Sequence, residues 1–188
     1  MTRRADSIED TRRQIAAAAA RLHTSIGPAN TSIAAIAEEA GVTRLTVYRH
    51  FDDFDVLFAA CRAHWRAENP PPDPRAWSAV SGLGPRARRA FAEWFGWYAE
   101  HATELFPIYR DLTTMPATSQ ATMRAENQRL AELLCGPDVP DGPTGETQRA
   151  VARHLLDFRT WRSLAVDQEL PPDQVVDVAV RLLLAAGE

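Results

Sequence analysis

Lysine is absent from the 188 residues: all 21 basic residues are arginine, and 25 acidic residues bring the net charge to −4. An excess of acids excludes a protein that binds nucleic acid over its whole surface. The two cysteines, Cys61 and Cys135, lack metal-ligand spacing and are too few for a disulfide framework, so a reducing compartment is expected. No apolar run approaches the roughly 20 residues that cross a bilayer, and the N-terminal residues lack the apolar centre of a signal peptide. We therefore expect a cytoplasmic protein.

Motifs of catalysis are also scarce. The sequence has no glycine-rich phosphate loop and no nucleophile motif. Two histidine–carboxylate pairs, His101 with Glu104 and His154 with Asp157, are each spaced by one helical turn, which suits acid–base or metal chemistry. Neither pair has a visible third partner, so an enzyme is the disfavoured alternative. We expect no cofactor and no metal.

Helical periodicity runs through almost the whole chain, and sustained alternation of apolar and polar residues is missing. The fold class predicted is therefore all-α, with about nine helices. Ser7 precedes the first of them, and Ile8 and Ile15 are expected on its buried face. Thr31 and Ser32 are alternative caps for the second. The expected helices cover residues 8–25, 32–40, 43–51, 53–69, 86–101, 103–114, 117–135, 146–168 and 173–186.

A proline-rich stretch, PPPDP at residues 70–74, ends any helix and predicts a boundary. We divide the chain into a head (residues 1–51), a connecting helix (52–69) and a body (75–188). Charge is uneven across this boundary. Residues 1–66 carry nine arginines and eight acids, whereas residues 67–188 carry twelve arginines and seventeen acids. The more positive charge balance of residues 1–66 favours this part of the chain as the one that binds a polyanion.

The stretch GVTRLTVYRHF, from Gly41 to Phe51, has the spacing of a helix-turn-helix. Ala37 is small enough for two helices to cross, Gly41 permits the turn, and Val47 lies inside the second helix where it locks the crossing. The second helix is expected to bury Val42, Val47 and Phe51. Its opposite face is then free to enter a groove of DNA.

The exposed side chains of that helix suit DNA contacts of two kinds. Arginine pairs with guanine in the major groove, and threonine or leucine meets the thymine methyl group, whereas contacts to phosphate fix position without reading sequence. The alternative is an ordinary solvated helix face. The expected DNA-binding residues are Thr31, Thr43, Arg44, Leu45, Thr46, Tyr48, Arg49 and His50, of which Arg44, Leu45 and Thr46 read bases and Thr31, Thr43, Tyr48 and His50 hold phosphates.

Residues 31–61 resemble the TetR family of transcriptional repressors. The resemblance is carried by the helix that opens at Thr31, by IAEEAGV at 36–42, by TVYRHF at 46–51 and by Leu57. It implies a three-helix DNA-binding head, a fourth connecting helix and a helical body. In the family, the body binds a small ligand, the last two helices dimerise, and ligand binding spreads the two heads and releases the operator.

Two positions depart from the family pattern. Phe54 replaces a lysine that reaches DNA phosphate, and Leu45 stands where glycine or alanine is usual. The resemblance therefore implies weaker non-specific binding, or an operator that accepts an apolar contact. An N-terminal arm would restore positive charge, and its arginines are Arg3, Arg4, Arg12 and Arg13.

The body is rich in aromatic residues, which predicts an apolar ligand pocket with a few polar groups. The alternative is that the rings form packed core or a dimer interface. Candidate ligand-binding residues are Phe91, Trp94, Phe95, Tyr98, His101, Phe106, Tyr109, His154, Phe158 and Trp161. Two terminal series at helical spacing predict a four-helix dimer interface: Val151, Leu155, Phe158 and Ala165, and Val175, Val178, Leu182 and Ala185.

From these patterns we expect a homodimeric regulator, most simply a repressor, that binds palindromic double-stranded operator DNA. A small apolar or aromatic effector would release it. The alternative function within the same fold is a DNA-binding dimer that does not respond to a small molecule.

Overall fold

The computed structural model describes the backbone of residues 2–188 and the side chains of residues 7–188. Helices account for the regular structure, and the described residues contain no strand, which confirms the all-α prediction. The chain forms two compact units, residues 1–70 with 103–121 and residues 71–102 with 122–188. The first break falls inside the proline-rich stretch. Residues 103–121 group with the head, although the sequence predicts them to be part of the body.

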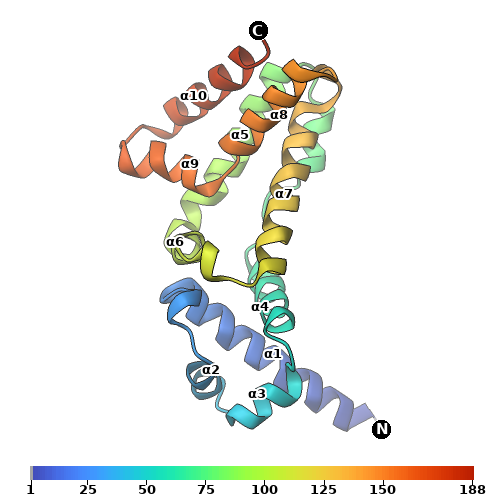
Figure 1. Cartoon of the computed structure of the whole chain (residues 1–188), viewed down its shortest axis with the longest axis vertical. Helices are drawn as coiled ribbons and strands as arrows, with labels where there is room; N and C mark the ends of the chain where they lie inside the picture. Colours follow the sequence, from blue (N-terminus) through green and yellow to red (C-terminus); the bar gives the residue numbers. More distant parts are fainter. Residues whose placement is uncertain (1) are drawn as a thin grey trace. The chain divides into compact units, whose positions relative to one another are not determined.

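The first unit contains the head helices and most of α6 (Figure 1). Its elements are α1 (Thr2–Ser25), the 3-10 turn η1 (Pro28–Asn30), α2 (Ile33–Glu39), α3 (Arg44–His50), α4 (Phe54–Glu68), α6 (Ala102–Arg110) and the 3-10 turn η3 (Leu112–Thr114). α7 (Ala117–Cys135) begins in the first unit and continues in the second.

The second unit contains the remaining helices, and α10 packs against both α5 and α8. Its elements are the 3-10 turn η2 (Pro74–Ala79), α5 (Leu83–Glu100), η4 (Gly136–Asp138), α8 (Pro143–Leu155), α9 (Phe158–Arg162), the π-helical turn η5 (Ser163–Asp167) and α10 (Pro172–Ala185). No helix among the described residues is both long enough and apolar enough to cross a membrane.

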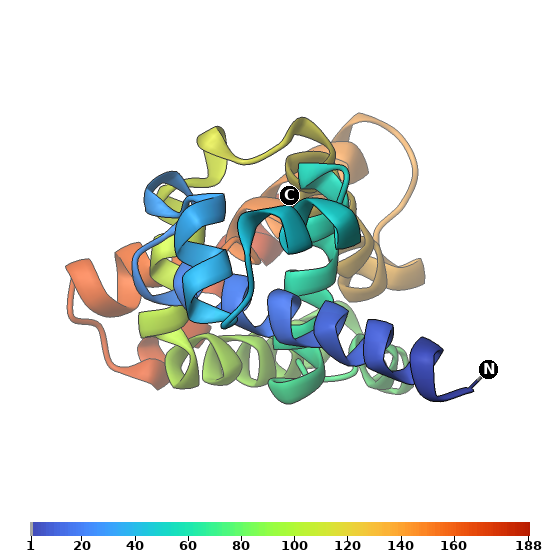
Figure 2. The ribbon, with the colours of Figure 1, turned by 90° about the horizontal axis from the view of Figure 1, so that it is seen from below.

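The head core forms where α1 packs against α2 and α4. Ile15, Ala18 and Ala19 are fully buried, and the small alanines let the neighbouring helices come close. Ile8 is predicted to lie on this buried face, but 53% of its surface is exposed. The reason is that α1 starts earlier than predicted and its N-terminal turns extend past the other head helices (Figure 2).

A buried histidine–cysteine contact joins α1 to α4 in the head. His23 is 3% exposed, its Nδ1 lies 3.4 Å from the Sγ of Cys61, and its ring stacks on Phe58 at 4.6 Å. Burial lowers the pKa of His23 to about 4 and raises the pKa of Cys61 to about 12. Both groups are therefore neutral near pH 7, and the Cys61 thiol is a packing group without thiolate reactivity.

The helix predicted over residues 146–168 is two helices in the structure. α8 ends at Leu155, and Asp157 caps α9 by accepting a hydrogen bond from the Arg159 amide at 2.8 Å. The same carboxylate is ion-paired with the Arg159 guanidinium at 2.9 Å. The Asp157 carboxylate therefore has a structural role as the cap of α9.

Candidate nucleic-acid interface

The turn between α2 and α3 depends on a glycine in the left-handed conformation. Gly41 has φ 66°, donates its amide to the Glu38 carbonyl at 3.0 Å, and is followed by Val42, whose amide donates to the Ala37 carbonyl at 2.9 Å. These bonds satisfy the free carbonyls at the end of α2. A residue with a side chain adopts this φ only with strain. Gly41 thus sets the direction in which α3 leaves the turn.

One face of α3 is fixed in the core. Val47 is fully buried, Phe51 is 3% exposed, and both pack in the cluster that holds Ile15 and Ile36. The burial predicted for Val47 and Phe51 is confirmed. Val42 is only partly buried and packs at the edge of the cluster. The apolar side therefore anchors a helix of seven residues that is too short to be stable alone.

The opposite face of α3 is open. Leu45 is 68% exposed and Tyr48 is 55% exposed, and Arg44 and Arg49 are exposed beside them. Neither arginine forms an ion pair with any residue whose side chain the structure describes, so both guanidinium groups are free to meet an external anion. His50 is half-buried at the end of the helix.

Two threonines form the N-terminal cap of α3. The Thr43 hydroxyl accepts a hydrogen bond from the Thr46 amide at 3.1 Å, and the two hydroxyl groups lie 2.9 Å apart. Because one hydroxyl donates to the other, one hydrogen of the pair remains available to an external acceptor. The cap therefore fixes both side chains next to the exposed face.

Ser32, and not Thr31, caps α2: its hydroxyl accepts from the Ala35 amide at 3.1 Å. The Thr31 hydroxyl donates to the Gly27 carbonyl at 2.8 Å, and the Thr31 amide donates to the Pro28 carbonyl. Both donors of Thr31 are thus used inside the head, which leaves none for the phosphate contact expected from the sequence. Ser32 is exposed and keeps its hydroxyl hydrogen. Both residues are good caps by type, so the sequence alone does not choose between them.

Three comparisons bear on these observations. Residues 15–61 match the family model of bacterial regulatory proteins, tetR family. A crystal structure of a tetR-family transcriptional regulator from Streptomyces coelicolor is similar over 95% of this chain and 80% of that chain, with a TM-score of 0.65 and 20% identity. No curated protein matches the chain. At that identity the solved structure shows a shared fold, while the family match spans α2, the turn and α3.

Residues 15–61 belong to the tetR family of bacterial regulatory proteins. The matched residues include all of the helix-turn-helix and reach Cys61 in α4. They also include the head core formed by Ile15, Ile36 and Val47. The family match therefore covers α3 together with the core that anchors it.

Where the TetR-family pattern has a lysine, this chain has an exposed phenylalanine at the start of α4. Phe54 is 46% exposed and its ring lies 5.9 Å from Phe58. The Asp53 carboxylate next to it accepts from the Asp55 amide at 2.8 Å and caps α4. Asp53, one of three acids around Phe54 (Asp52, Asp53 and Asp55), thus has a structural role.

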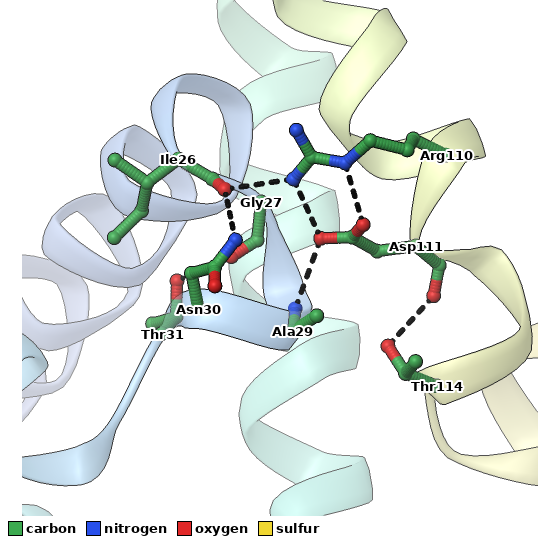
Figure 3. A network of polar contacts seen from close by, with 8 residues as sticks. All are labelled: Ile26, Gly27, Ala29, Asn30, Thr31, Arg110, Asp111 and Thr114. Carbon is green, nitrogen blue, oxygen red and sulfur yellow. Dashed lines mark hydrogen bonds and ion pairs between the residues drawn. The ribbon is translucent and has the colours of Figure 1, made fainter.

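A polar network joins η1 to the end of α6 (Figure 3). Asp111 is buried, and its carboxylate accepts from the Ala29 amide at 3.1 Å and from Arg110 at 2.7 and 2.9 Å. Arg110 also donates to the Ile26 carbonyl at 2.9 Å. The bonds from Arg110 hold the pKa of Asp111 below its usual value. Gly27, at φ 93°, has no room for a Cβ because the Asp111 carboxylate occupies that place.

The ten candidate ligand-binding residues do not all fall in one unit. Phe106 and Tyr109 lie on α6 in the first unit, and the other eight lie in the second. Within the second unit, the Tyr98 ring lies 5.3 Å from Phe158 and 5.8 Å from Trp161, and its hydroxyl donates to the Leu156 carbonyl at 2.8 Å. These rings are buried and contact one another, as the packed-core alternative predicts. Phe91 stacks on Phe95, and the Trp97 ring lies 5.7 Å from Trp94 and 5.4 Å from His101. The His154 Nε2 lies 3.5 Å from the Thr160 hydroxyl.

Proposed function

We propose that this TetR-family regulator is a repressor that binds palindromic operator DNA as a homodimer and is released by a small apolar or aromatic effector. The observation that carries the proposal is the two-sided character of α3. Its inner face, with Val47 and Phe51, is buried, while its outer face presents free guanidinium groups and an exposed leucine. A helix of this kind fits the major groove of DNA. The protein is proposed to act in the cytoplasm.

The outer face divides into residues that read bases and residues that hold phosphates. Arg44, Leu45 and Thr46 read bases, because they lie in the first turn of α3, the part of a recognition helix that approaches base edges. Leu45 selects an apolar contact such as a thymine methyl group. Phosphate contacts come from Thr43, Tyr48 and His50, with Arg49 as a further cation, and Ser32 takes the place that the sequence predicts for Thr31.

We place the dimer interface on α10. Leu155, Phe158 and Val175 of the expected seam are 2% exposed or less, so the core of the second unit already uses them. Val178, Leu182 and Ala185 instead line a surface hollow together with Arg181, and Leu182 is 52% exposed. A twofold dimer matches an operator whose half-sites are about 34 Å apart, or a multiple of that distance.

Response to an effector is supported by the position of α6. Tyr109 comes directly before Arg110 and Asp111, and Phe106 lies about one turn earlier on α6. Asp111 accepts from the Ala29 amide in η1, and Arg110 donates to the carbonyl of Ile26 just before η1. An effector that favours one arrangement of α6 would therefore act on a segment bonded to the head. The proposal keeps the division into a head (1–51), a connecting helix (52–69) and a ligand-binding and dimerisation body (75–188), with residues 103–121 as the part of the body that packs with the head.

The proposal is tested by selection of duplexes from a random pool with the purified protein, followed by binding titrations at several salt concentrations. We expect a twofold-symmetric consensus whose affinity falls with salt. A screen of apolar and aromatic compounds for raised melting temperature and reduced operator binding then tests the effector. Failure to enrich any duplex, even at low salt, contradicts the DNA-binding proposal. Enrichment without any responsive compound leaves the alternative, a DNA-binding dimer without small-molecule response.

Arg44→Ala should weaken binding to the selected operator by about 1–3 kcal/mol and relax one base preference, because alanine cannot form the bidentate pair to guanine. The measurement is a titration against the operator and its single-base variants. Arg21→Ala is the control, because Arg21 is exposed on α1 and already paired with Glu39 at 2.7 Å. An equal loss of affinity on every sequence would place Arg44 on a phosphate.

Leu182→Ala should raise the dissociation constant of the dimer by about 30-fold, because the twofold axis applies the truncation twice, at about 1 kcal/mol for each copy. Analytical ultracentrifugation over a concentration series measures it. Val166→Ala is the control, since Val166 is 45% exposed and lies outside the proposed interface. Unchanged dimerisation in the Leu182 variant would remove α10 from the interface.

A further inference from the structure

Arg12 on α1 reaches the C-terminal end of the recognition helix. Its Nη1 donates to the His50 carbonyl at 2.5 Å, and its guanidinium carbon lies 4.2 Å from the centre of the Phe51 ring. All three residues belong to the first unit. The Arg12 side chain thus binds the last carbonyl of α3 and lies over the ring of Phe51, the residue that follows the helix.

The contact matters because α3 has only seven residues, and the last carbonyls of any helix lack partners within it. Its N-terminus is held by the Thr43 cap and its middle by Val47 in the core. At the C-terminus a positive guanidinium also complements the negative end of the helix dipole. Phe51 is anchored from two sides, by the core and by the cation–π contact.

We propose that Arg12 is a positioning residue for DNA reading: it holds the C-terminal end of α3 so that the outer side chains keep their register in the groove. The inference rests on the proposed role of α3 in binding operator DNA. It goes beyond the local sequence, since 38 residues separate Arg12 from His50. The sequence predicts Arg12 in an N-terminal arm that contacts DNA, whereas the proposal gives it a positioning role inside the head.

The neighbouring arginine behaves differently. Arg13 is exposed and forms an ion pair with Asp10 on the same helix, and its guanidinium makes no hydrogen bond to the residues of α3. Arg12 is half-buried, and its Nη1 is directed to the His50 carbonyl. The side chains of Arg3 and Arg4 lie outside the described residues. Arg12 and Arg13 therefore form a matched pair, in which one side chain binds α3 and the other remains on the surface.

The test compares Arg12→Ala, Arg12→Lys and Arg13→Ala on the selected operator. We expect Arg12→Ala to bind about tenfold more weakly with an unchanged salt dependence, because removal of a charged hydrogen bond acts through α3 and not on a phosphate. Arg12→Lys should recover part of the affinity, since lysine still donates to a carbonyl. Arg13→Ala should bind within about twofold of the unchanged protein.

Hydrogen exchange of the free protein gives a second readout. In Arg12→Ala the amides of residues 44–51 should exchange faster, while those in the centre of α1 and in α4 keep their protection. Faster exchange throughout the head would make Arg12 a general stabiliser and overturn the inference. Equal operator affinity of the Arg12→Ala and Arg13→Ala variants would also overturn it. So would a salt slope that falls by about 0.9 in Arg12→Ala, because that change is the mark of one phosphate contact.

Failure of the proposed function gives a different pattern. If the unchanged protein enriches no duplex, DNA reading fails, but the exchange difference between the two arginine variants is still expected. If the operator binds and the exchange difference is missing, the positioning role of Arg12 fails alone.

Discussion

Arg86→Met should lower the free energy of unfolding of the second unit by about 3–5 kcal/mol, the range typical of a broken buried ion pair. Arg86 is 4% exposed and binds four acceptors. Its Nε donates to the Val80 carbonyl at 3.2 Å, its Nη1 to the carbonyls of Leu134 and Cys135 at 3.3 and 2.9 Å, and its Nη2 to Asp138 at 2.5 Å. Methionine preserves the apolar stem but leaves these acceptors without a donor.

The size of this effect depends on where those acceptors lie. Leu134 and Cys135 are the last two residues of α7, and Arg86 lies in the first turn of α5, so the guanidinium on α5 binds the free carbonyls at the end of α7. Denaturant unfolding followed by tryptophan fluorescence measures the effect, because four of the five tryptophans lie in the second unit: Trp77, Trp94, Trp97 and Trp161. The matched control is Arg88→Met: Arg88 is exposed and paired with Asp177 at 2.6 Å, so we expect a loss of less than about 1 kcal/mol. Equal losses of stability in the two variants would contradict the prediction.

The helix-turn-helix could be predicted from the sequence because its determinants are local. Gly41 supplies the turn, Thr43 caps the next helix, and Val47 and Phe51 recur at helical spacing, all within about ten residues. Such short-range rules fix which face of α3 is buried. The resemblance to the TetR family is visible in the sequence for the same reason, since its motif residues are close in the chain.

What sequence reasoning missed depends on contacts across long separations. Arg12 and Arg86 look like ordinary surface charges until the fold brings them to carbonyls 38 to 49 residues away. The break between α8 and α9 depends on Asp157, which caps α9. Apolar residues recur at helical spacing across this break, so periodicity alone predicts one continuous helix. The sequence pattern predicts Ile8 in the core, but Ile8 is exposed because the first turns of α1 extend past the other head helices. Periodicity identifies an apolar face but does not show where the opposing surface ends.

The head should lose up to about 3 kcal/mol of stability as the pH falls from about 6.5 to about 4, because His23 must stay neutral in the folded protein. Burial lowers its pKa from 6.5 to about 4. The His23 ring contacts the Cys61 thiol and the Phe58 ring, and no carboxylate among the described side chains pairs with it. Between these two pH values the unfolded chain binds a proton that the folded chain excludes. Protonation therefore favours unfolding in this window, and the contribution of His23 is complete above pH 6.5.

The contribution of His23 is isolated by comparing the unchanged protein with His23→Phe, in which an aromatic ring can still stack on Phe58 but cannot take up a proton. Unfolding of the head, measured at fixed temperature between pH 4 and 7.5, should be markedly less sensitive to acid in this variant, and operator binding should survive to lower pH. His64→Gln is the control, because His64 lies on α4 near Glu68 and outside the head core. If acid destabilises the His23 variant as much as the unchanged protein, carboxylates such as Asp111, whose pKa is held low by Arg110, account for the acid sensitivity instead.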